Sequence, residues 1–105
     1  MSANYKVVFR NRANIDFIDA YTWYEKQQEG LGERFFNAIV NKSELISSDP
    51  HLFKTSYNKY HEVLLDKFPY LIIYTINDRQ KIVRIMAIFH TSRNPHNKYK
   101  KQQPK

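Results

Sequence analysis

The residues best suited to chemistry stand at the end of one hydrophobic stretch, Phe68–Pro95. His90 and Arg93 close this stretch, and Tyr99 follows in a basic tail. RNA cleavage needs groups that activate a ribose 2′-hydroxyl, protonate the leaving oxygen and stabilise a pentacoordinate phosphate. His90 as a base and Arg93 as a phosphate clamp would fit those roles, with Tyr99 near them. The sequence therefore contains a candidate set for RNA cleavage.

A His-Glu pair earlier in the chain could complete this set. Either His61 or Glu62 would be a second acid or base, provided that the strands bring it to the same end of the sheet as His90. The same residues also have structural interpretations. A His at a strand end can simply be partly buried, and Arg93 can bond backbone carbonyls or pair with Glu62. At His61, a neutral imidazole is a poorer phosphate ligand than an arginine.

The last apolar run also offers a surface for a partner. By strand alternation Arg84 shares a face with Met86, Ile88 and His90, and it could bind an acidic partner or reach solvent. The expected binding residues are Arg84, Met86, Ile88, Arg93, Lys98, Lys100 and Lys101.

Other kinds of site are not indicated. The four histidines lack the spacing of a zinc site. Gly30 and Gly32 stand between two helical patterns rather than after a strand, so they do not form a phosphate-binding loop. We expect neither a metal nor a cofactor.

Composition predicts one domain, residues 1–95, followed by a basic tail, residues 96–105. The net charge of the 105 residues is +7, and the last 13 residues hold five bases and no acid. Such a tail is typical of binding to RNA, DNA or an acidic protein, but it can also serve solubility alone. The chain has no cysteine and no long apolar run, which favours a cytoplasmic protein without a membrane span.

The hydrophobic pattern predicts an α+β fold. Asn14 is expected to cap a first helix, with Asp16 in its first turn, and Gly30 to end it. A second helix then ends before Asp49-Pro50, so the two form an antiparallel helical hairpin. A loop is expected over His51–Ser56. The expected strands are Tyr5–Arg10, Tyr57–Leu65, Tyr70–Ile76 and Lys81–His90, the last three forming an antiparallel meander, with the helices packed on one face of a twisted sheet.

This order of elements resembles the RelE/ParE superfamily of toxins from type II toxin–antitoxin systems. The resemblance covers roughly residues 5 to 95, and it looks closer to the ParE-like, plasmid-stabilisation branch. It rests on Ala20-Tyr21 with Trp23-Tyr24-Glu25, Gly30-Leu31-Gly32 with Phe35, Asp49-Pro50, Phe68-Pro69-Tyr70 with Ile72 and Tyr74, and Ala87-Ile88-Phe89-His90 with Arg93 and Pro95.

The resemblance implies a growth-inhibiting toxin that is neutralised by a cognate antitoxin, usually acidic, in a hetero-oligomer. ParE-like members poison DNA gyrase without being enzymes, whereas RelE-like members cut messenger RNA in the ribosome. RelE-like enzymes use cationic side chains on the central strands, where this sequence has Glu62, Leu64 and Leu71. Leucines cannot bind a phosphate, so the gyrase-directed function is expected.

Two other functions stay open at this point. One is a ribosome-dependent mRNA endonuclease that uses His90, Arg93 and Tyr99, since some toxins of the superfamily use a Glu with a C-terminal His and Tyr. The other is a basic RNA-binding α+β module without toxin activity.

Overall fold

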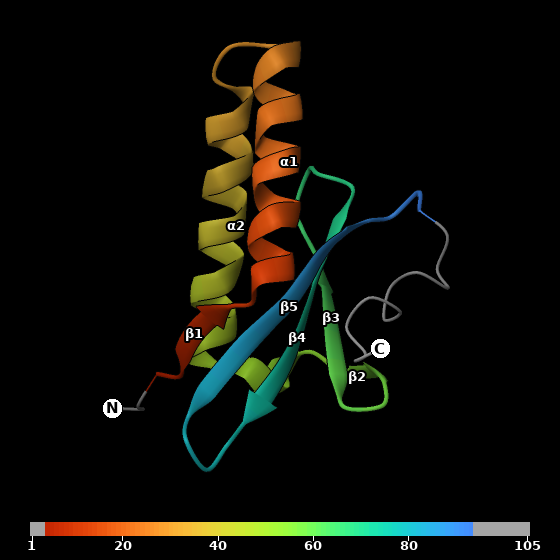
Figure 1. Ribbon diagram of the computed structural model, residues 1–105. Coiled ribbons are helices and arrows are strands. Elements are labelled where there is room, and N and C mark those ends of the chain that lie inside the picture. Colours follow the sequence, from red (N-terminus) through yellow and green to blue (C-terminus); the bar gives the residue numbers. More distant parts are fainter. Residues whose placement is uncertain (1–3, 94–105) are drawn as a thin grey trace.

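The structure is a computed structural model that describes residues 4–93. A helical hairpin lies on one face of a twisted five-stranded sheet (Figure 1). The predicted α+β fold is therefore confirmed. Within residues 4–93, no helix combines the length and apolar character needed to cross a membrane.

The helices are α1, Asn11–Gln27, and α2, Leu31–Ser48. The chain can reverse direction between the two helices because Gly30 adopts a left-handed φ of 89°. The Glu25 carboxylate accepts hydrogen bonds from the backbone N–H groups of Gly30 and Gly32, both at 2.9 Å. A Cβ at position 32 would lie 2.8 Å from that carboxylate and 3.0 Å from the Tyr21 backbone carbonyl, so a larger residue would displace the Glu25 side chain. Glu25 therefore satisfies free N–H groups at the start of α2.

The predicted start of the first helix is wrong. The helix begins at Asn11, three residues before Asn14, and Arg10 is the N-cap. Asp16 lies beyond the first turn, where its carboxylate accepts hydrogen bonds from Arg12 Nε at 3.1 Å and from the Ile88 backbone N–H at 2.9 Å. Asp16 therefore joins α1 to the sheet instead of serving the helix dipole.

The sheet has the strand order β1-β5-β4-β3-β2. The edge strand β1 runs parallel to β5, and every other pair is antiparallel. The predicted meander is present but has one more strand, because Asn58 and Lys59 form a turn inside the expected strand Tyr57–Leu65. The predicted loop likewise contains most of a short 3₁₀ helix, Pro50–Leu52, and part of this extra strand. The strands are β1 Lys6–Phe9, β2 Thr55–Tyr57, β3 Tyr60–Leu64, β4 Tyr70–Asn77 and β5 Ile82–His90.

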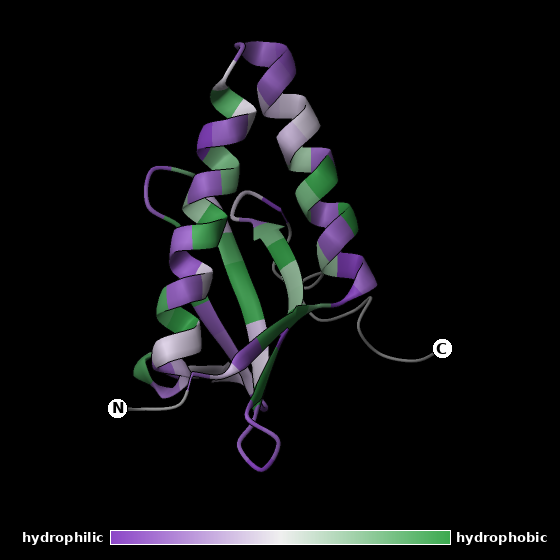
Figure 2. Cartoon of the chain, turned by 90° about the vertical axis from the view of Figure 1, so that its left-hand side faces the viewer, coloured by the Kyte–Doolittle hydropathy of each residue, from purple (hydrophilic) through white to green (hydrophobic). Residues whose placement is uncertain are grey.

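The main core lies between the helices and the sheet. Figure 2 shows that the central strands are mostly hydrophobic, whereas each helix alternates hydrophobic and hydrophilic residues. Phe35 of α2 is fully buried, and its ring lies 5.3 Å from that of Phe68 and 5.2 Å from that of Tyr70. Tyr24 of α1 packs against all three of these rings, those of Phe35, Phe68 and Tyr70. The abundant aromatic residues thus build the contact between the hairpin and the sheet.

A β-bulge in β5 decides which residues face the helices. Tyr74 pairs with Ile85 while Ile73 pairs with Ala87, so Met86 is the extra residue. Before the bulge Ile85 faces the helices, and after it Ile88 does. The prediction that Arg84, Met86, Ile88 and His90 share one face is therefore wrong, because the bulge reverses the alternation between Met86 and Ile88.

Candidate functional site

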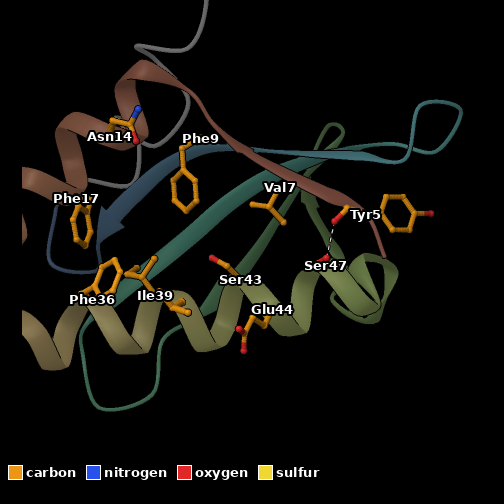
Figure 3. Close-up of a pocket in the computed structure, with 11 residues that line it drawn as sticks. Tyr5, Val7, Phe9, Asn14, Phe17, Phe36, Ile39, Ser43, Glu44 and Ser47 are labelled. Carbon is orange, nitrogen blue, oxygen red and sulfur yellow. Dashed lines mark hydrogen bonds between the residues drawn. The ribbon is translucent and has the colours of Figure 1, made fainter. Parts of the chain in front are cut away.

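A groove with a volume of about 500 Å³ lies between β1 and α2. In Figure 3 Val7 and Phe9 of β1 point toward α2, and Ile39 and Ser43 of α2 point back toward β1. Its lining is Tyr5, Val7, Phe9, Asn14, Phe17, Phe36, Ile39, Val40, Ser43, Glu44 and Ser47. Apart from Glu44 at the rim, no lining residue carries a charge. We call this site the apolar groove.

One polar group inside the apolar groove lacks a partner. The Ser43 hydroxyl oxygen is fully buried and has no hydrogen-bond partner among the described residues. A buried polar group without a partner is unfavourable, and because this oxygen has no exposed surface, a docked segment could bond it only after the Ser43 side chain rotates. The lining of the groove is therefore mostly apolar, and Asn14, Ser43, Glu44 and Ser47 add polar groups to it.

The wall formed by β1 is also an open edge of the sheet. The backbone N–H groups of Lys6 and Arg10 bond to the carbonyls of Lys81 and Ile85. By alternation, the backbone groups of Val7 and Phe9 point away from β5, toward the open edge. An added strand could pair with these groups and place side chains in the apolar groove.

The apolar surface continues onto α1. Phe17 and Phe36 line both the apolar groove and a neighbouring pocket that Ile18 and Tyr21 also line. Ile18 is 58% exposed and Phe36 is 46% exposed. Large exposed apolar side chains that adjoin a groove mark a contact surface for another protein.

His61 lies on the helix-facing side of β3, where its role is structural. It is buried, its ring stacks on Tyr74 at 5.1 Å, and its Nδ1 donates to the Phe53 carbonyl at 2.8 Å. Tyr74 in turn donates its hydroxyl hydrogen to the Pro50 carbonyl at 2.7 Å. Burial raises the pKa of Tyr74, so this phenol stays neutral. These contacts fix the 3₁₀ helix under the end of the sheet.

His90 and Arg93 lie together at the opposite end of the sheet. Both line a pocket of about 360 Å³ against α1, the end pocket, with Trp23 and Tyr70 among its walls. The Ser92 backbone N–H donates to His90 Nδ1 at 3.0 Å, so a neutral His90 carries its proton on Nε2. Burial raises the pKa of Tyr70, and the nearby Arg93 charge partly offsets that effect. The expected grouping of His90 and Arg93 is thus present.

The two histidines do not meet as expected. His61 is paired opposite Tyr74, and His90 is paired opposite Tyr70. Four residues along a strand amount to roughly 13 Å. The prediction that His61 and His90 meet at one end of the sheet is therefore wrong.

Glu62 is on the other face of the sheet. It pairs with Ile73, which belongs to the apolar cluster opposite the helices, whereas His90 contacts Tyr70 on the helix side. Glu62 therefore cannot act with His90 on one bound phosphate. Tyr99, Lys98, Lys100 and Lys101 lie outside the described residues, so their predicted roles stay predictions.

The face opposite the helices carries Glu62, Leu64 and Leu71, which the resemblance matches to the cationic positions of RelE-like enzymes. Leu64 pairs with Leu71 there, next to Glu62. The bulge leaves Arg84 on this face, paired with Thr75, but turns Ile88 into the helix-side core, where it is 2% exposed. Within residues 4–93, the described side chains hold no group of three His, Asp or Glu residues that could bind a metal.

Sequence reasoning missed the apolar groove. Phe36, Ile39, Ser43 and Ser47 recur at helical spacing on α2, which is a detectable signal. Trp23 of α1 is 56% exposed and touches Tyr24 edge-on at 5.2 Å.

Comparison with known proteins agrees with this architecture. Residues 7–95 match the family described as the ParE toxin of the type II toxin–antitoxin system parDE. The chain belongs to this family, and it is thus a toxin of the ParE/RelE kind. No curated protein matches the chain.

Solved structures share the fold at low sequence identity. A chromosomal ParDE system from P. aeruginosa matches with a TM-score of 0.73 at 13% identity, over 87% of this chain and 100% of that one. The RelBE2 toxin–antitoxin complex from Mycobacterium tuberculosis matches with a TM-score of 0.64 at 20% identity, over 86% and 94%. An archaeal RelE–RelB complex from Pyrococcus horikoshii matches with a TM-score of 0.55 at 12% identity, over 87% and 99%.

Proposed function

We propose that this toxin is ParE-like, of the plasmid-stabilisation kind, and inhibits growth by binding DNA gyrase rather than by cutting RNA. One observation carries the proposal: His61 and Glu62 do not converge on the pocket that His90 and Arg93 line. His61 is held in a structural contact, Glu62 and His90 face opposite sides of the sheet, and Leu64 and Leu71 occupy the strand positions that a RelE-like enzyme would need for cations. The toxin therefore inhibits its target by binding it and not by catalysing a reaction. The proposed target places it in the cytoplasm.

The apolar groove is the proposed site for a cognate antitoxin. Solved structures with this fold include toxin–antitoxin complexes. The groove offers a mostly apolar lining and an open strand edge at Val7 and Phe9. A segment that pairs as a strand and inserts apolar side chains would use both features.

A supercoiling assay with purified toxin and gyrase tests the proposed target. We expect loss of supercoiling and accumulation of cleaved DNA–gyrase complexes, both reversed by the antitoxin. His90→Ala should retain this inhibition, because the proposed action does not use an acid or base. Fully active gyrase at saturating toxin would rule the proposal out.

A ribosome-dependent mRNA endonuclease is the second candidate, because His90 and Arg93 do line one pocket. Here His90→Ala and Arg93→Ala should each abolish codon-phased cleavage in a translation extract. Intact message with the unaltered protein removes this candidate.

A further inference from the structure

A second groove, of about 650 Å³, lies between α2 and the loop that joins β3 to β4. Arg34 and Lys42 of α2 form one wall, and Lys67 of the loop belongs to the other. Leu31, Ala38 and Phe68 supply apolar surface between them. We call this site the basic groove. It shares no lining residue with the apolar groove.

The cations of the basic groove are poorly neutralised within the chain. The Lys42 side chain is 15% exposed, and its Nζ lies 3.7 Å from Asp66 Oδ1, which is too long for a hydrogen bond. Asp66 itself is 86% exposed, so solvent weakens this attraction. Within residues 4–93, neither Arg34 nor Lys67 forms an ion pair. Three cations therefore face one loosely held carboxylate.

The backbone at Lys67 adds an independent observation. Lys67 has a φ of 68°, in the left-handed region where glycine or asparagine is favoured. A lysine here carries a backbone cost that a turn glycine would avoid. Residues kept in unfavourable backbone conformations cluster at functional sites. The loop thus holds a cation on the groove wall at a position where turn geometry alone favours another residue.

The shape and lining of the basic groove indicate its partner. Arg34 and Lys42 are eight residues apart, about 12 Å along the helix, which matches roughly two turns of a docked helix. The amide side chains of Asn37 and Asn41 also line the groove, and they can both donate and accept hydrogen bonds. Its apolar surface would be of little use to a phosphate backbone.

Phe68 argues further against nucleic acid. Its ring is already packed edge-on against Tyr24 and Phe35, at 5.1 and 5.3 Å, so it is not free to stack on a base. We propose that the basic groove binds an acidic, amphipathic helical segment of a protein partner. The partner's carboxylates contact Arg34, Lys42 and Lys67, and its apolar residues pack between the walls.

A labelled synthetic helical peptide with one leucine stripe and one glutamate stripe tests the proposal by fluorescence anisotropy. The triple variant R34Q/K42Q/K67Q should bind it at least about tenfold more weakly than the unaltered toxin. The control K26Q/K54Q/K59Q removes the same charge at exposed positions that line neither groove, and it should change affinity less than about threefold. Thermal unfolding verifies that both variants fold. Equal losses in the two variants, or no binding of the peptide at low salt, would overturn the proposal.

A second arm separates a protein partner from nucleic acid. Leu45 is 41% exposed and lines the basic groove, so Leu45→Ser should weaken peptide binding without changing the charge. A single-stranded oligonucleotide of the same net charge as the peptide should bind more weakly than the peptide. If the oligonucleotide instead displaces the peptide, and Leu45→Ser has no effect, the groove binds phosphates and the proposal fails. Because the basic groove lies apart from the apolar groove, such a failure would leave the gyrase and antitoxin proposals unaffected.

Discussion

The two sides of helix α2 differ in chemistry although they share one backbone. On the β1 side, Phe36, Ile39, Ser43 and Ser47 line the apolar groove, whose one charged lining residue is Glu44. On the loop side, a stripe with the same helical spacing lines the basic groove; it consists of Arg34, Asn37, Ala38, Asn41, Lys42 and Leu45. Each stripe repeats every three to four residues, so each stays on its own side of the helix.

This difference indicates two kinds of contact. An apolar groove beside an open strand edge derives affinity from burial and backbone pairing. A groove with cations on two walls depends on charge, and it therefore responds to salt and favours acidic partners. One 18-residue helix can thus present two surfaces, because its third side, centred on Phe35 and Ile46, is fixed in the core.

The largest expected effect comes from removing that fixed third side. Phe35→Ala should lower the free energy of unfolding by about 3–5 kcal/mol, because it empties a fully buried site that touches Tyr24, Phe68 and Tyr70. Both grooves would lose their common wall. Urea unfolding measures the change.

The neighbouring phenylalanine is the matched control for this test. Phe36 is 46% exposed, so Phe36→Ala should cost less than about 1 kcal/mol. Similar losses for the two variants would show that α2 is not anchored through Phe35.

A charge placed in the apolar groove should separate the two grooves. Phe36→Asp should weaken antitoxin binding by at least about 30-fold, the effect of losing a contact worth about 2 kcal/mol. Binding of the acidic peptide in the basic groove should not change. Titration calorimetry measures both affinities.

Leu64→Asp is the control for that charge. Leu64 is 54% exposed on β3 and lines neither groove, so this variant should leave both affinities unchanged. If Phe36→Asp leaves antitoxin binding intact, the apolar groove is not the antitoxin site.

A smaller effect is expected at the start of α2, which supports both grooves. Glu25→Ala leaves the N–H groups of Gly30 and Gly32 without their carboxylate, which should cost about 1–2 kcal/mol. The melting temperature should fall by about 4–8 °C for each kcal/mol. Glu29→Ala, an exposed acid in the same linker, should change stability by less than about 0.5 kcal/mol. Equal melting temperatures for the two variants would contradict this role of Glu25.

Much of the fold could be predicted from sequence because its signals are local. The helical spacing of apolar residues, Gly30 and the turn residues fixed the hairpin and the meander within a few residues. The start of α1 was missed because Asn14 looks like a cap, whereas Asp16 is used by a tertiary bond to Ile88. No local sequence pattern predicts a contact between residues that lie 72 positions apart.

The candidate site could be predicted only in part, for a similar reason. His90 and Arg93 are close in sequence, so their common pocket follows from the strand end. The bulge at Met86 has no clear sequence signal, and it reverses every face assignment after it. The basic groove combines residues of α2 with a loop more than twenty residues later in the chain. Its cluster of cations could not be predicted from the sequence, where the excess of positive charge is concentrated in the tail.

The smallest expected effect concerns one end of the apolar groove and depends on pH. Tyr5 donates its hydroxyl hydrogen to Asp78 at 2.6 Å, and His51 Nε2 lies 2.8 Å from the same oxygen. The bond from Tyr5, followed by that from His51, lowers the pKa of Asp78. A carboxyl group whose pKa is lower in the folded state stabilises the fold above its unfolded pKa, about 3.9, and loses that contribution as the pH falls through the folded value.

Asp78 should therefore matter at neutral pH and cease to matter in acid. The excess melting temperature of the unaltered protein over Asp78→Ala should shrink between pH 5 and about pH 3. It should be small throughout, because both partners are exposed and water screens the bond. In a Tyr5→Phe background the effect of Asp78→Ala should be smaller still, since the larger of the two bonds to that carboxylate is already gone. A difference in melting temperature that stays constant down to pH 3 would show that Asp78 does not hold Tyr5. Tyr5 would then be held at the end of the apolar groove by Ser47 alone, whose backbone carbonyl and hydroxyl both bond the Tyr5 backbone.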